Sequence, residues 1–206
     1  AVGSLALDAN TTGFQNTAVG YLSMSTNTTA SNNTSLGYNS LGLNTTGTQN
    51  TAVGSQSLLN NTTGQSNTAV GYQAAKSITT GSYNTVIGEL ALLDNTTGQA
   101  NTALGRAALF DNTEGNNNTS VGYNSLLVNT TGSFNVAVGA SALDANVTSS
   151  SNTAIGYNSL TANTAASNTA VGKDSLESNT SGGSNVAVGA DAVSYTHLRA
   201  HETSRY

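Results

Sequence analysis

Few residues of this chain could perform acid–base, nucleophilic or metal chemistry. Among its 206 residues there are only two histidines, His197 and His201, and there is no cysteine. Serine and threonine hydroxyls are abundant, but both histidines lie near the C-terminus, so the rest of the chain cannot form a Ser-His-acid arrangement. Without cysteine there is no thiolate nucleophile, no thiolate metal ligand and no disulfide.

The ten acidic residues add little to this inventory. They are scattered over the sequence, and a pair such as Asp111 and Glu114 would need to face one substrate bond to act together. The two histidines have a metal-ligand spacing but no supporting ligands, and the nucleotide-binding G-x-x-x-x-G-K-[S/T] and calcium-binding G-G-x-G-x-D motifs are absent. We therefore predict a protein that is not an enzyme, with no catalytic, metal-binding or cofactor-binding residue and no cofactor.

Composition excludes further classes of partner. Charged residues make up 7% of the chain, against roughly 25% in ordinary soluble domains. The net charge is −5 and no basic cluster exists, so we expect no binding to nucleic acid. No apolar run approaches the ~20 residues of a membrane helix, so we expect no membrane contact.

A repeat unit of 17 residues fills the chain from residue 1 to residue 192. Its marker is a glycine after an aliphatic residue, which we number position 0, and one unit is a residue shorter than the others. The aliphatic residue at −1 is Val, Leu or Ile in every unit, position +3 is Ala or Ser, and position +4 is mostly Leu. The unit reads N-T-A-V-G-x-x-[A/S]-L-x-x-N-T-T-G-x-x.

This unit opposes helix formation and favours strands and turns. N-T-A-V reads as a short strand, x-[A/S]-L as a second short strand, and the glycine and N-T-T-G as turns. We therefore predict an all-β fold, a parallel β-roll or β-solenoid of about eleven coils stacked ~4.8 Å apart into a rod on the order of 50 Å long.

Two asparagines occupy fixed positions in the unit. Stacked coils would place identical side chains above one another, so asparagines at −4 and +7 can form amide ladders along the rod, whereas stacked Asp would repel. Ile78 interrupts the +7 row, in the unit that also has Ala75 in place of Leu. We predict a structural ladder at −4 formed by Asn16, Asn33, Asn50, Asn67, Asn84, Asn101, Asn118, Asn135, Asn152, Asn168 and Asn185.

The expected core is thin. We expect the large side chains at −1 and +4 to fill it, and the small residue at −2, on the opposite strand face, to point outward. An apolar outer face and a small core together indicate homo-oligomerisation, unless Ala at −2 is simply exposed.

An intermittent row of tyrosines occupies position +1. It reads as a seam across coils or subunits, or as a stacking platform for a glycan or a partner protein. The residues are Tyr21, Tyr38, Tyr72, Tyr123 and Tyr157.

Residues 193–206 abandon the repeat and contain both histidines. The string VSYTHLRAHET resembles the translation of a transposon-end adapter used in sequencing libraries, so we interpret these residues as a non-native, disordered tail. The first unit begins in mid-repeat, so we expect residues 1–192 to be a fragment of a longer array, cut at both ends.

The motif N-T-A-V-G-x-x-[A/S]-L resembles the YadA-like head repeats of trimeric autotransporter adhesins over nearly the whole chain. The resemblance implies a left-handed parallel β-roll, three chains wound together and display on the bacterial cell surface for attachment to host or matrix. The units here are longer, and similar arrays occur in phage tail-fibre-type proteins.

Three functions follow from these observations. The first is a structural and adhesive surface rod, extracellular on a bacterial cell, with further copies of itself and a surface protein or glycan as partners. The second is the shaft of a phage or phage-like tail fibre, located on the virion. The third is binding to ice or another crystalline surface by the threonine rows at −3, +8 and +9, although strand and turn preferences also explain those rows.

Overall fold

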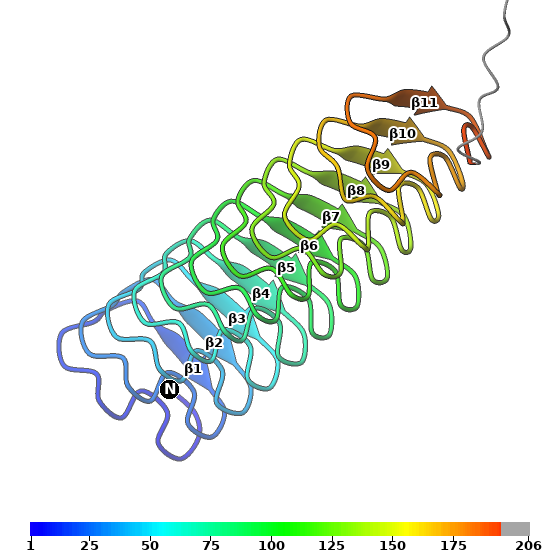
Figure 1. Ribbon diagram of the computed structural model, residues 1–206. Helices are drawn as coiled ribbons and strands as arrows, with labels where there is room; N and C mark the ends of the chain where they lie inside the picture. The colour runs from blue at the N-terminus through cyan, green and yellow to red at the C-terminus, as the bar shows by residue number, and fades with distance from the viewer. Residues whose placement is uncertain (195–206) are drawn as a thin grey trace, which may run out of the picture.

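The computed structural model describes residues 1–194, which form a straight stack of coils (Figure 1). Each repeat unit makes one coil, and the predicted all-β parallel β-solenoid with coils of about 17 residues is confirmed. The described residues contain no helix, and therefore none that could cross a membrane. The predicted tail at 193–206 lies outside the described residues except for Val193 and Ser194.

Each coil contributes one three-residue strand to a single sheet. The eleven strands pair in sequence order, all parallel, so that threonine stacks above threonine, as in Thr51 and Thr68. The strands are β1 (Thr17–Val19), β2 (Thr34–Leu36), β3 (Thr51–Val53), β4 (Thr68–Val70), β5 (Thr85–Ile87), β6 (Thr102–Leu104), β7 (Thr119–Val121), β8 (Val136–Val138), β9 (Thr153–Ile155), β10 (Thr169–Val171) and β11 (Val186–Val188).

The predicted second strand is wrong. Positions +1 to +6 are turns, in which +2 and +4 have positive φ, as Asn39 (50°) and Leu41 (51°) show. Adjacent strand residues point to opposite faces, but this backbone buries both neighbours, Ser40 and Leu41. The turns still bond between coils, because the Leu41 N–H donates to the Ser57 carbonyl at 2.9 Å. One sheet and a hydrogen-bonded run of turns therefore enclose the core.

The predicted orientation of the strands is also wrong. In every strand the middle residue, at −2, is buried, while threonine at −3 and the aliphatic residue at −1 face outward. Ala69 has no exposed surface, whereas Leu36 is 48% exposed. The leucines at +4 already fill the narrow interior, so only small side chains fit beneath most of the sheet.

The bend after each strand requires glycine. Gly71 has φ 141°, and a Cβ there would lie 2.5 Å from the Gly88 carbonyl oxygen of the next coil. From Gly3 to Gly172, a Cβ at position 0 would lie 2.3–2.6 Å from the carbonyl oxygen of the next coil, which explains why the glycine does not vary.

Candidate functional site

The asparagines at −4 are buried from Asn33 to Asn168, and all of their side-chain groups except Asn152 Nδ2 bond to neighbouring coils. The Asn50 backbone N–H donates to Asn33 Oδ1 at 2.8 Å, and Asn33 Nδ2 donates to the Gly47 carbonyl at 2.9 Å. The first of these bonds recurs along the row from Asn33 to Asn185. These side chains therefore hold the coils in register and are not available to a ligand.

The asparagines at +7 form a second internal row. Asn44 Nδ2 donates to Asn27 Oδ1 of the preceding coil at 2.9 Å, and also to the Gly47 carbonyl at 3.0 Å. Ile78 breaks this row and leaves Asn61 Oδ1 buried without a donor. The unit of 16 residues leaves two further orphan groups, Asn146 Oδ1 and Asn152 Nδ2.

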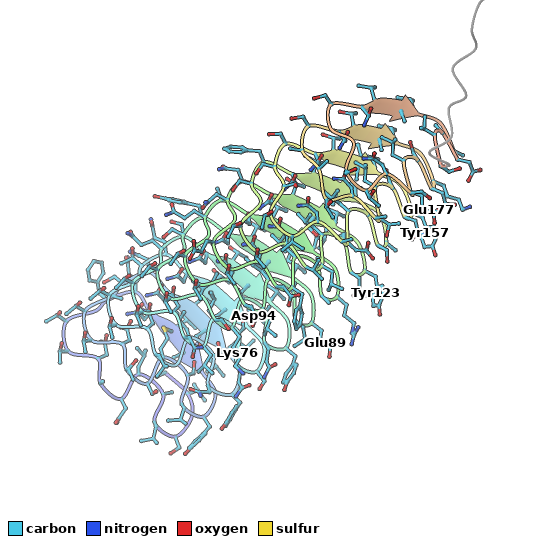
Figure 2. The ribbon with its side chains drawn as sticks, in the orientation of Figure 1. Lys76, Glu89, Asp94, Tyr123, Tyr157 and Glu177 are labelled. Carbon is cyan, nitrogen blue, oxygen red and sulfur yellow. The ribbon has the colours of Figure 1, made fainter. Side chains whose placement is uncertain are left out.

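The tyrosines at +1 lie on the surface beyond the glycine bend, each about half exposed. The structure brings only neighbours together: the Tyr21 and Tyr38 rings stack with centroids 5.9 Å apart, at an interplanar angle of 18°. Glu89, Tyr123 and Tyr157 follow the same edge of the rod (Figure 2). Arg106 joins two of these coils, because its guanidinium lies 5.7 Å from the Tyr123 ring centre and its Nε lies 3.3 Å from Glu89 Oε2.

The acidic side chains do not form a reactive cluster within residues 1–194. Partial burial, and then the charge of Asp94, raise the pKa of Asp111. Asp144 accepts a hydrogen bond from Thr161, and a hydrogen bond to Asp174 raises the pKa of Lys173. No group of three metal-ligating side chains gathers in this part of the chain, and His197 and His201 lie outside it.

The outer face of the sheet is the surface that our sequence interpretation missed. It carries two parallel rows, threonine at −3 and an aliphatic residue at −1, along all eleven strands with valine replacing two threonines. In most strands a small residue separates Thr from an aliphatic residue, so these two side chains lie on the same face of the sheet. This alternation is the sequence signal that could have revealed the outer face. Because Val is larger than Ala, the sequence alone favours the aliphatic row as the buried one.

No protein-family model, curated protein or solved structure matches this chain. Its surfaces and their chemistry therefore carry the functional argument.

Proposed function

We propose that this chain is a non-enzymatic structural and adhesive rod, the head-type repeat region of a trimeric surface adhesin. One observation carries the proposal: an invariant internal frame supports outward positions that vary. The −4 asparagine, the position 0 glycine and the inward −2 residue barely change, whereas position +1 ranges from tyrosine to Glu89, Arg106 and Lys173. A fixed scaffold supplies length and stiffness, and its variable surface supplies recognition.

Association with further copies of the chain belongs to this proposal, and we assign it to the tyrosine row. Half-exposed aromatic side chains recur at one position in five of the coils and provide rigid contact area along the rod. The row is long and narrow, as a seam between parallel rods would be. Glu89 and Arg106 pair with each other within one chain, and their half-exposed charges would also help to fix the register of neighbouring copies.

The experiment for self-association is the molar mass of the full chain in solution, measured by light scattering after size exclusion. We expect a trimer, and we expect Tyr38→Ser combined with Tyr123→Ser to shift it toward monomer without changing the circular dichroism spectrum. Serine is the natural residue at the same position in Ser55, so the fold accommodates it. A monomeric parent chain would contradict the assigned seam.

Adhesion is tested separately with beads that carry the folded chain. Such beads should attach to matrix-coated or cell-coated surfaces more strongly than beads that carry the heat-unfolded chain. Equal attachment of the two bead preparations would refute the adhesive role, whatever the oligomeric state.

A further inference from the structure

The outer face of the sheet is uniform over its whole length. The first residue of nine of the eleven strands is threonine, from Thr17 in β1 to Thr169 in β10, and Val136 and Val186 replace the other two. The third residue of every strand is Val, Leu or Ile. No charged residue occurs within β1–β11, so this face, which we call the Thr/aliphatic face, is neutral throughout.

The threonine hydroxyls of this face differ from those of the turns. At +8 the hydroxyls are used within the rod, as when Thr45 Oγ1 donates to the Thr62 carbonyl at 3.0 Å and Thr62 Oγ1 to the Thr79 carbonyl at 3.0 Å. Within residues 1–194, none of the nine threonines in the strands uses its hydroxyl in a hydrogen bond with the protein, because every bonded threonine hydroxyl belongs to a residue outside the strands. Nine hydroxyls in one row, interrupted only at Val136 in β8, are therefore left to bond with something outside the chain.

The spacing of these groups is regular in two directions. Neighbouring strands lie about 4.8 Å apart, and the −3 and −1 rows lie about 6.6 Å apart along the strand. Two water oxygens that share a tetrahedral neighbour lie about 4.5 Å apart, because each of their hydrogen bonds is about 2.8 Å long. The hydroxyl row thus repeats at nearly the second-neighbour distance of tetrahedral water. Threonine and valine are also stiff at χ1, so the pattern is preorganised.

We propose that the Thr/aliphatic face binds ice. An ice surface is neutral and periodic and offers a water molecule to each free hydroxyl, while the aliphatic row fits against it without competing for hydrogen bonds. A charged mineral surface would call for charged residues, which this face lacks. A second copy of the chain would desolvate nine hydroxyls, and each of them that found no partner would oppose association. The inference does not rest on the adhesive role proposed above.

The test is thermal hysteresis of the full chain, measured on single ice crystals together with their habit. The parent chain should depress the growth temperature below the melting temperature and produce faceted crystals. Thr68→Tyr combined with Thr102→Tyr places two protrusions on the Thr/aliphatic face, and we expect it to lose more than half of the hysteresis. Outward-facing strand positions accept aromatic residues, so the fold should persist.

The matched control is Thr63→Tyr combined with Thr97→Tyr, at the exposed +9 position of nearby coils. This variant should keep the parent hysteresis, because it alters a turn on another face. Should the first double variant unfold, Thr85→Lys, which places one charge on the same face, should also lower the hysteresis while retaining the parent circular dichroism spectrum.

Three outcomes would overturn the proposal, two of them seen in the hysteresis and one in the molar mass. One is a folded parent chain without hysteresis, and another is equal loss in the face and turn variants. A lower molar mass for the Thr68/Thr102 variant than for the parent chain, measured by light scattering, would assign the face to a second copy instead. The tyrosine-row seam fails separately. In that case Tyr38→Ser combined with Tyr123→Ser would not lower the molar mass, and the hysteresis of the parent chain would be unaffected.

Discussion

At the scale of single residues, backbone geometry explains the invariance of the glycine at position 0. The coil must turn sharply after the strand, and the bend brings this residue against the carbonyl of the next coil. Any side chain there faces both an unfavourable φ and a collision with backbone, neither of which can relax without moving two coils.

This leads to a prediction for Gly71→Ala. The new Cβ would lie 2.5 Å from the Gly88 carbonyl oxygen at φ 141°, so we expect the free energy of unfolding to fall by at least about 2 kcal/mol. Urea unfolding followed by circular dichroism measures the change. Ser55→Ala, at the outward position beside an equivalent glycine, serves as the control and should differ from the parent by less than about 0.5 kcal/mol. If Gly71→Ala lowered the free energy of unfolding by no more than the Ser55→Ala control does, this account would be contradicted.

Which side chains of each strand face the core was harder to predict than which positions repeat in every unit. Period-two alternation shows that Ala69 and Val70 point to opposite sides, but it does not show which side is the core. Side-chain size favoured Val70 as the buried residue, yet Ala69 is buried because Leu58 and the other +4 residues fill the interior. Orientation therefore depended on the volume between the sheet and the turns, which is a property of the whole coil.

At the scale of the coil, the irregular unit around Ile78 shows how two departures from the repeat compensate. Ala75 replaces the usual leucine and Ile78 replaces the usual asparagine, and both are fully buried in the same apolar cluster. The extra volume of Ile78 offsets the volume missing at Ala75. The remaining cost is electrostatic, because Asn61 Oδ1 has no donor.

We therefore predict strong coupling between these two positions. Ile78→Asn alone would restore a donor for Asn61 but leave a cavity, and Ala75→Leu alone would overpack the coil. The double variant restores the consensus unit, so its free energy of unfolding should exceed the additive expectation by about 1–3 kcal/mol. A double-mutant cycle in urea measures this coupling. Additive effects of the two substitutions would show that the side chains do not share one volume.

The turns were the part of the coil that sequence reasoning misassigned. Leucine rarely adopts positive φ, so x-[A/S]-L reads as a strand when each unit is taken alone. In the stack, Leu41 and its equivalents adopt this conformation because hydrogen bonds to both neighbouring coils compensate for it. The single-coil sequence contains no information on those bonds, whereas the asparagine and glycine rows were visible through their repetition.

At the scale of the whole molecule, each coil bonds mainly to the coil before it and the coil after it. The sheet order runs from β1 to β11 without a crossover, and the stack in Figure 1 is straight. A rod of this kind is quasi-one-dimensional, so its length should follow the number of units and its fold should depend on their phase.

Deletion of one complete unit tests this property. Removing residues 89–105 joins Gly88 to Arg106, so that β5 can pair directly with β7 and every position keeps its phase. We expect a folded rod whose maximum dimension, measured by small-angle X-ray scattering, is shorter by about 4.8 Å, with little change in circular dichroism per residue. Removing only residues 89–97 places turn residues where strand residues belong, and it should unfold several coils. If both deletions shortened the rod without loss of structure, the phase of the repeat would not determine the fold.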